Sequence, residues 1–356
     1  MPSPFRIAIV GAGTLLGQEI GTALRDRRFP MRSPLLLDDV AETAAPEAAA
    51  PEADEATRWL RTFGDEPALM EQPQAKHFEN LDVVFFAGDA AQTRRHFAAL
   101  RGHEALALDV VGALRDEPQA ELLAPGAALG AASGLRPRLI AIPHPASLVL
   151  LEVLRSVHAA APLSSASAVV VEPASERGQA GIFELQQQTL GLLRFQSLPT
   201  EIFDVQVSFN LRAGLGSSAL PDLTGIGARI GREVAHFLAL GGNNAPPPPA
   251  VQVLQGALFH SHAISLCLRT TAPATASALQ HALQAAGLVD AEPEMPDPVA
   301  ATGKDTALLG PVVADAAAPQ SFWIFAAQDN LRRRALCAVD LALACLGTKP
   351  RPQRVI

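Results

Sequence analysis

The stretch Leu139–Leu151 is the part of the sequence that most suggests chemistry. It begins as a short apolar run, which fits a buried strand, and apolar residues recur at helical spacing from Ser147 onward. A strand that turns sharply into a helix points the free N–H groups of the helix into the turn, where they favour an anion or a reactive thiolate. The turn holds His144, Pro145 and Ala146, and no cysteine. The predicted strand–turn–helix would activate a thiolate, but the sequence places no thiol there.

The polar residues raise two other possibilities, a hydrolase nucleophile and a metal site. Ser147 could act as a hydrolase nucleophile, but no GxSxG elbow surrounds it, and a capping serine is the simpler interpretation. His260 and His262 would share one face of a strand, and His144 could join them as a ligand. No carboxylate or cysteine completes a recognisable ligand spacing, so the sequence predicts no metal site.

A glycine-rich segment near the start of the chain is typical of a dinucleotide-binding turn. The apolar run Phe5–Val10 precedes it, and a helical segment follows it to about Arg27. In this setting Gly11 allows the tight turn, Gly13 lets a pyrophosphate approach the backbone, and Gly17 allows close packing of helix and strand. The GxGxxxG spacing is one residue longer than GxGxxG, so a Rossmann-like turn that holds no ligand is the alternative. The predicted cofactor-binding residues here are Gly11, Gly13, Thr14, Leu15, Leu16 and Gly17.

Two charged positions follow predicted strands of the same half. The predicted strand Pro34–Asp38 ends in Asp38, and Asp39 follows it. An acidic residue about 20 residues past the glycines bonds a ribose 2′-hydroxyl and repels a 2′-phosphate. Asp38 therefore favours NAD over NADP, unless these residues are solvated loop carboxylates. Arg115 follows the predicted strand Ala105–Val110, on the side where such sheets bind ligands, and is a candidate anion site. A solvated loop arginine is the alternative.

The alternation of strands and helices predicts a doubly wound parallel sheet. After the first unit, the pattern continues with a strand at Asp82–Ala87, a helix at Ala90–Leu100 and the strand at Ala105–Val110. Residues 40–57 are rich in Ala, Pro and Glu and are predicted to form an exposed insertion. Later predicted strands are Ser164–Val171, Val205–Leu211, Val251–Leu258, Ser261–Thr270 and Ser321–Ala327, and later helices are Asp222–Leu240, Ala276–Ala286 and a last one that ends near Leu346.

Composition limits the partners and the setting. A chain of 356 residues is too long for one ordinary core, so two domains are expected. With 5% aromatic residues, no tyrosine, a net charge of −8 and no basic stripe, neither nucleic acid nor an anionic membrane is an expected partner. The three cysteines lie in apolar surroundings and are expected to be buried and reduced. We see no signal peptide and no uncharged run of transmembrane length, and predict a cytoplasmic protein.

Four motifs follow one another in an order that matches a known family. The segment Gly11–Gly17 corresponds to a GATGxVG loop, and Asp109–Arg115 stands where that family has an Asp followed by Asn-Ser-Ser-Ala-Phe-Arg. Glu184–Thr189 matches a helix motif EL-x-x-QT, and Asp329–Ala335 matches a closing DNL motif, with Arg334 at a glycine position. Over nearly its whole length the chain resembles the aspartate-semialdehyde dehydrogenase family, and more closely its Usg-type branch.

The central turn departs from this family at the catalytic position. Where the family has Asn-Pro-Asn-Cys-Ser-Thr, this sequence reads Ile142-Pro-His-Pro-Ala-Ser147. The resemblance puts Pro145 in place of the cysteine whose thiolate attacks the aldehyde to form a thiohemiacetal. Pro145 has no nucleophilic atom, so the phosphorylating dehydrogenase reaction is not expected.

The resemblance also assigns roles elsewhere in the chain. His262 retains the family's acid/base histidine, Glu172 stands at the position of a substrate-orienting glutamine, and Gln255 replaces the active-site arginine, as in Usg-type proteins. The substrate-binding positions that the resemblance implies are Arg115, Arg229 and Gln255, and the cofactor-binding position in the DNL motif is Asn330.

The expected architecture is α/β, with a Rossmann-type doubly wound parallel sheet and an α+β dimerisation and substrate domain. The dinucleotide-binding domain is predicted at residues 1–143, completed by 330–356, and the second domain at 144–329. The family implies NAD or NADP as cofactor and a homodimer whose contact lies on the second domain.

Three functions remain open from the sequence. The first is a catalytically silent relative that still binds a dinucleotide and dimerises, as a regulatory or assembly partner. The second is an oxidoreductase with altered, non-covalent chemistry that uses His262 and Arg115. The third is a structural module whose cofactor cleft is filled by Arg334.

Overall fold

The computed structural model describes residues 4–39, 60–63, 66–125, 137–219, 222–289 and 295–347. The chain divides into two compact units, and we describe each by itself. The first comprises Met1–Pro143 and Arg334–Ile356, and the second comprises His144–Arg333. The Ala/Pro/Glu-rich stretch 40–57 lies outside the described residues.

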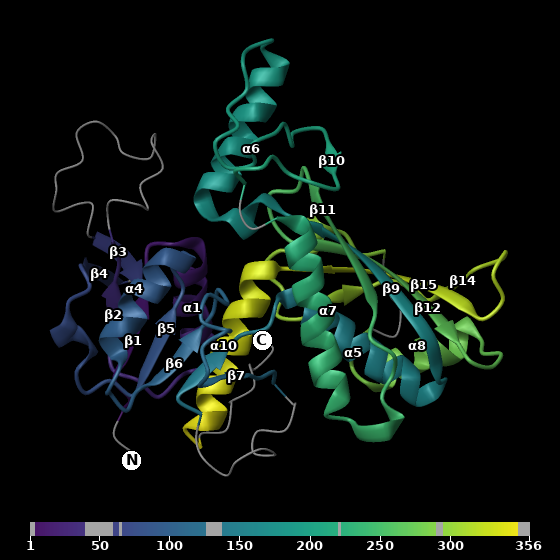
Figure 1. The fold of residues 1–356 in the computed structure, drawn as a ribbon, viewed down its shortest axis with the longest axis horizontal. Coiled ribbons are helices and arrows are strands. Elements are labelled where there is room, and N and C mark those ends of the chain that lie inside the picture. Colours follow the sequence, from purple (N-terminus) through teal and green to yellow (C-terminus); the bar gives the residue numbers. More distant parts are fainter. Residues whose placement is uncertain are drawn as a thin grey trace. The chain divides into compact units, whose positions relative to one another are not determined.

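The first unit is built on a sheet with strand order β3-β4-β2-β1-β5-β6-β8-β7 (Figure 1). All neighbouring strands are parallel except β3, which is antiparallel to β4. The predicted parallel, doubly wound sheet is confirmed. The strands are β1 (Ile7–Val10), β2 (Leu35–Leu37), β3 (Leu60–Phe63), β4 (Glu66–Glu71), β5 (Val83–Phe86), β6 (Leu106–Asp109), β7 (Ala120–Leu122) and β8 (Leu139–Ala141).

Short apolar strands and capped helices explain this arrangement. Every residue of β1, β5, β6 and β8 is buried, as parallel strands covered on both faces require. Thr14 caps helix α1 by accepting the N–H of Gly17, and Asp89 caps α4 by accepting the N–H of Gln92. The helical segments are α1 (Leu15–Asp26), the 3₁₀ turn η1 (Ala75–Phe78), α4 (Ala90–Leu100) and the part of α10 (Asn330–Cys345) that follows Arg333.

The second unit contains a mixed sheet with strand order β10-β11-β9-β12-β15-β13, and β14 also pairs with β15. Strands β9 and β11 are parallel, and the other pairs are antiparallel. Helices α5, α7 and α8 lie on one side of this sheet (Figure 1). The strands are β9 (Leu163–Glu172), β10 (Leu211–Arg212), β11 (Ala250–Gly256), β12 (His262–Thr270), β13 (Leu308–Leu309), β14 (Val313–Ala314) and β15 (Ser321–Gln328). The helices are α5 (Pro145–Ala160), η2 (Ala174–Arg177), α6 (Gly178–Leu193), α7 (Leu223–Ala239), η3 (Gly242–Asn244), α8 (Ala276–Ala285) and α9 (Pro298–Ala301).

Two predictions about local structure are wrong. Val205–Leu211 is not a strand, because only Leu211–Arg212 pairs, as β10, and the residues before it form turns. His260 and His262 do not share a strand face, because β12 begins at His262 and the preceding Ser261 has a φ of 68°. The alternating apolar residues of Val205–Leu211 are loop residues whose side chains pack inward, such as the fully buried Val207.

No helix in the described part of the chain has the length and apolar character needed to cross a membrane.

Candidate functional site

Four polar side chains form a row across the sheet of the second unit. Gln255 on β11 pairs in register with Glu172 on β9, and His262 on β12 pairs with Gln328 on β15. Ala263 pairs with Val171, so one residue further along the same two strands His262 lies opposite Glu172. All four side chains are buried, with exposed fractions of 0–1%. We call Gln255, Glu172, His262 and Gln328 the polar row.

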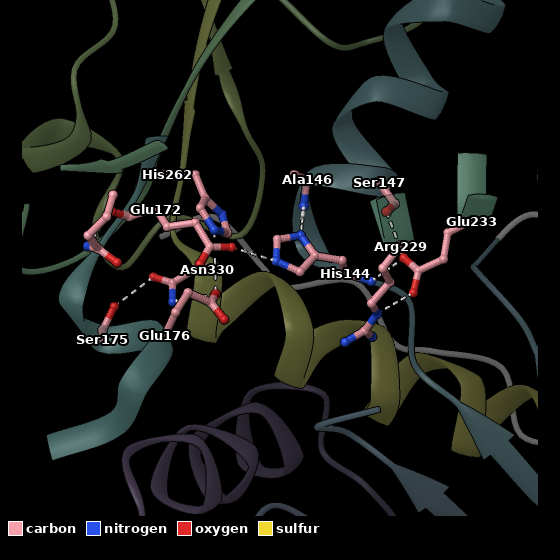
Figure 2. Close-up of polar contacts among 11 residues, drawn as sticks. His144, Ala146, Ser147, Glu172, Ser175, Glu176, Arg229, Glu233, His262 and Asn330 are labelled. Atoms are coloured by element: carbon pink, nitrogen blue, oxygen red, sulfur yellow. Dashed lines mark hydrogen bonds and ion pairs between the residues drawn. The ribbon is translucent and has the colours of Figure 1, made fainter. Parts of the chain in front are cut away.

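The row meets the start of helix α5, where His144 is the N-cap. The His144 Nδ1 atom accepts the backbone N–H of Ala146 at 3.2 Å, so the proton of the neutral ring lies on Nε2. That Nε2 atom lies 3.1 Å from Oε1 of Glu172 and donates to it (Figure 2). The ring centroids of His144 and His262 are 5.2 Å apart. The N-cap of α5 therefore places a second histidine beside His262, and β9 supplies the carboxylate of Glu172.

Pro145 occupies the first position of α5 and is buried. Its missing N–H costs nothing there, since that donor has no partner within the helix. No sulfur or hydroxyl lies at this place in the turn. The nearest hydroxyl in the sequence, that of Ser147, donates to Oε2 of Glu233 at 2.7 Å.

Glu233 on α7 holds the start of α5 in place. Its Oε2 atom also accepts the backbone N–H of His144 at 2.7 Å, and its Oε1 atom lies 2.6 Å from Nε of Arg229 (Figure 2). Burial alone would raise the pKa of Glu233, but Arg229, His144 and Ser147 outweigh it and hold that pKa below its ordinary value. Arg229, predicted as a substrate-phosphate contact, thus lies in a buried ion pair, with 15% of its side chain exposed.

Asn330, the first residue of α10, connects the segments that contain Ser175, Glu176 and Ser261. Its Oδ1 atom accepts the hydroxyl of Ser175 at 3.1 Å and the N–H of Ser261 at 3.2 Å. Its Nδ2 atom donates to Glu176 at 2.9 Å, and that carboxylate lies 3.5 Å from Nε2 of His262 (Figure 2). Within the second unit, the predicted cofactor contact is a fully buried residue that positions Glu176 beside His262.

The two amides at the ends of the row are incompletely hydrogen bonded. The Nε2 atom of Gln255 donates to the carbonyls of Glu172 and Gly256, both at 3.0 Å, which leaves its Oε1 atom without a partner among the described residues. For Gln328, neither amide atom has a hydrogen-bond partner in that same part of the chain. Buried polar atoms of this kind call for an explanation, such as a bound ion or water.

The glycine segment of the first unit is tied to Asp38. The Asp38 Oδ2 atom accepts the N–H of Gly13 at 2.7 Å, and its Oδ1 atom accepts Nε2 of Gln92 at 2.9 Å. Asp38 is fully buried, so it is not a solvated loop carboxylate. Gly11 has a φ of 82°, which only glycine adopts freely. Leu15 and Leu16 follow in the first turn of α1.

The neighbouring charges of the first unit have local partners. Asp39 lies 2.9 Å from Nε2 of His96 and 3.3 Å from Nη1 of Arg95. Arg115 donates to the carbonyl of Gly112 at 2.9 Å, and 43% of its side chain is exposed. Asp109 shapes this loop, since it accepts the N–H groups of Gly112 and Leu114.

The helix motif Glu184–Thr189 forms hydrogen bonds to a neighbouring loop. Oε1 of Gln188 accepts the N–H groups of Val207 and Ser208, and its Nε2 donates to the carbonyls of Pro199 and Val205. Glu184 accepts the N–H groups of Ile202 and Phe203, which oppose the effect of burial, but burial still raises the pKa of Glu184. The motif therefore fixes residues 199–208 against α6.

Replacing Gln188 tests this function of the motif. The Gln188→Leu variant should lose about 2 kcal/mol of unfolding free energy, because buried N–H and C=O groups of the loop lose their partner. Urea denaturation measures the loss. Gln186→Leu, one of the exposed positions of the same helix, should change the free energy by less than about 0.5 kcal/mol. Equal effects of the two variants would contradict the assignment.

Three residues of the site were missed from the sequence. The sequence assigns no function to Glu176, to Glu233 in the predicted helix Asp222–Leu240, or to Gln328 after the predicted strand Ser321–Ala327. Arg229 and Glu233 are four residues apart on a helix, which is a signal for an ion pair. Gln328 gives no comparable local signal, since only the β12–β15 register places it beside His262.

Comparisons with known proteins identify the family of this chain. Residues 154–333 match the model of the semialdehyde dehydrogenase dimerisation domain, which is half of the chain. A USG-1 protein homolog from Pseudomonas aeruginosa is 28% identical over 338 residues, which cover 94% of this chain and 95% of that protein. A solved structure of a probable aspartate-semialdehyde dehydrogenase from the same organism has a TM-score of 0.79 and 26% identity, and covers 96% of this chain and 98% of its own.

A more distant structure shares the fold. The aspartate semialdehyde dehydrogenase of Candida albicans, solved with NADP, has a TM-score of 0.62 and 14% identity, and covers 97% of this chain and 99% of its own. The family model, the curated relatives and the similar structures all indicate the same family. The chain belongs to the semialdehyde dehydrogenase family, as a Usg-type member.

Proposed function

We propose that this protein binds a nicotinamide dinucleotide and forms a homodimer, but does not carry out the thiol-dependent reaction of its family. Pro145 at the first position of α5 carries this proposal. The strand–turn–helix that would activate a thiolate is intact, and the residue at the reactive place has no nucleophilic atom. Losing such a nucleophile lowers the rate by many orders of magnitude.

Two positions that the family resemblance links to the substrate also differ from the family pattern. Gln255 stands where the family resemblance expects an arginine, and both N–H donors of its amide are taken by backbone carbonyls. It therefore offers an acceptor, not a cation, to any substrate. Glu172 adds a carboxylate where the resemblance expects a neutral glutamine. Neither residue suits the carboxylate of an amino-acid aldehyde.

The first unit supports the cofactor. Its glycine turn, with positive φ at Gly11 between β1 and α1, has the form that brings a pyrophosphate to the start of α1. A structural neighbour holds NADP. Here a 2′-phosphate would meet the carboxylate of Asp38, so we expect NAD to bind more tightly than NADP.

A second candidate function rests on the pair His144 and Glu172. A buried histidine bonded to a carboxylate, with His262 beside it, is a set of groups that can move protons. This favours an oxidoreductase that acts on a carbonyl without a covalent intermediate, with His262 as its acid or base. The matched dimerisation domain supports the homodimer under either function.

Calorimetric titration with NAD, and separately with NADP, tests the proposal. We expect micromolar binding of NAD and weaker binding of NADP. No binding of either nucleotide at millimolar concentration would remove both cofactor-dependent functions and leave a structural module. Binding would justify a screen of aldehydes and hydroxy acids for turnover.

Restoring the thiol alone should not restore the reaction. We expect Pro145→Cys to show no phosphate-dependent oxidation of aspartate semialdehyde above background, because Gln255, Glu172 and Ala146 still differ from the family pattern. Steady-state absorbance of the reduced cofactor measures this. Turnover on the order of 1 s⁻¹ or faster, which is typical of enzymes, would show that these other departures matter little.

A further inference from the structure

One cluster of metal-ligating side chains stands out in the described part of the chain. His144, Glu172 and His262 each offer a ligand atom, these atoms all lie within 4.8 Å of one another, and all three residues are buried. Two imidazoles and one carboxylate are a set that binds Zn²⁺ in catalytic sites, where water completes the coordination. The cluster comes from three elements, the N-cap of α5, the end of β9 and the start of β12.

A second observation points to a cation at the same place. Gln255 and Gln328 flank Glu172 and His262 in the polar row, and both amides leave a buried Oε1 atom without a partner among the described residues. Both side chains are at least nine-tenths buried. An acceptor in that position is satisfied by a cation or by a water molecule that a cation holds.

The charges around the cluster favour a cation over an anion. Arg177 interacts electrostatically with three carboxylates, those of Glu172, Glu176 and Glu184. Arg229 forms its ion pair with Glu233 on α7. The single positive charge of Arg177 does not neutralise the carboxylates of Glu172, Glu176 and Glu184. A divalent ion would supply the missing positive charge.

We propose that His144, Glu172 and His262 bind a divalent transition-metal ion, with Zn²⁺ as the best fit to two nitrogens and one oxygen. This site is independent of the proposed cofactor. It stands beside the turn where the family resemblance expects a cysteine. The sequence predicts no metal because no carboxylate or cysteine completes a recognisable ligand spacing, and the fold supplies such a carboxylate from Glu172 on β9.

Binding must break two hydrogen bonds of His144. Nε2 of His144 now carries the proton that it donates to Glu172, and Nδ1 accepts from Ala146. A metal on Nε2 requires the proton on Nδ1, so the N–H of Ala146 loses its acceptor. The amide of Ala146 should therefore exchange faster with solvent, or shift in its NMR resonance, when the metal is added.

The test is titration of metal-free protein with ZnCl₂ by calorimetry, and with CoCl₂ by visible absorption. We expect about one equivalent of each ion per chain and the intense d–d bands of four- or five-coordinate cobalt. Glu172→Gln, which keeps the side-chain shape, and His262→Asn should each weaken binding by more than the roughly tenfold to hundredfold that loss of an outer-shell partner costs. His281→Asn on the exposed face of α8 is the matched control and should bind like the wild type.

Two results would overturn the proposal. One is no uptake of zinc or cobalt by the wild type at millimolar concentration. The other is wild-type binding by both Glu172→Gln and His262→Asn, which would place the ion elsewhere. Circular dichroism and thermal melting of the metal-free variants show whether each is folded, and either folded variant suffices for the comparison. Since no nucleotide is present, failure here leaves the proposed cofactor binding untouched.

Discussion

Gly17→Ala should lower the free energy of unfolding by about 3 kcal/mol or more, although alanine is the better helix former. A Cβ atom at this position would overlap the carbonyl oxygen of Gly11 and lie 2.8 Å from Cα of Ala12. Both are backbone atoms, so no side-chain rotation relieves the contact. Helix α1 would have to move away from the turn that follows β1, and the core of the first unit would open. Urea denaturation followed by circular dichroism measures the loss.

The matched control is Gly214→Ala in the second unit. No heavy atom lies within 4 Å of the Cβ atom that alanine would add there. The expected change is below about 0.5 kcal/mol. A Gly17→Ala protein as stable as the wild type would mean that helix and strand are not packed as closely as described. It would also remove the main structural support for the dinucleotide turn.

Glu233→Ala should cost about 3–5 kcal/mol of unfolding free energy, measured at pH 7 by chemical denaturation. The change leaves the guanidinium of Arg229 with only 15% exposure and without its carboxylate partner at 2.6 Å. It also removes the acceptor for the N–H of His144 and the hydroxyl of Ser147. The start of α5 would lose its attachment to α7.

An exposed ion pair is the control for this variant. Arg138 and Glu104 lie 2.8 Å apart with 62% and 89% of their side chains exposed, so solvent screens their attraction. Glu104→Ala should therefore change stability by less than about 1 kcal/mol. If the two variants lost the same free energy, the buried pair would have no special role in the site.

The effect of Glu233→Ala should also depend on pH in a known direction. The folded pKa of Glu233 lies below its ordinary value of 4.5, so the carboxylate stabilises the fold fully above about pH 4.5. That contribution is lost as the pH falls from 4.5 through the folded pKa. The stability difference between wild type and variant should shrink accordingly in acid. A difference that grows as the pH falls would contradict the lowered pKa.

The parallel sheet of the first unit could be predicted because its signals are local. Buried runs such as β1 and β5 are continuously apolar, and Thr14 and the glycines mark the turn between strand and helix. The short strands β7, β13 and β14 were missed, because two or three residues carry too little pattern to distinguish a strand from a loop. The false strand at 205–211 arose from alternation in a segment that Gln188 holds as a turn.

The sequence alone predicts that Pro145 stands where the family resemblance expects the cysteine, because the identity of a residue within a motif needs no coordinates. It also determined the glycine turn and the family resemblance, which depend on residues close together in the chain. Only the tertiary structure brought Glu172, His262 and His144 together, since they come from different elements and sheet register sets their distances. The same register placed Gln328 beside His262. Pairing between strands far apart in sequence leaves no local periodicity, which is why the composition of the site, and with it the metal proposal, came from the fold.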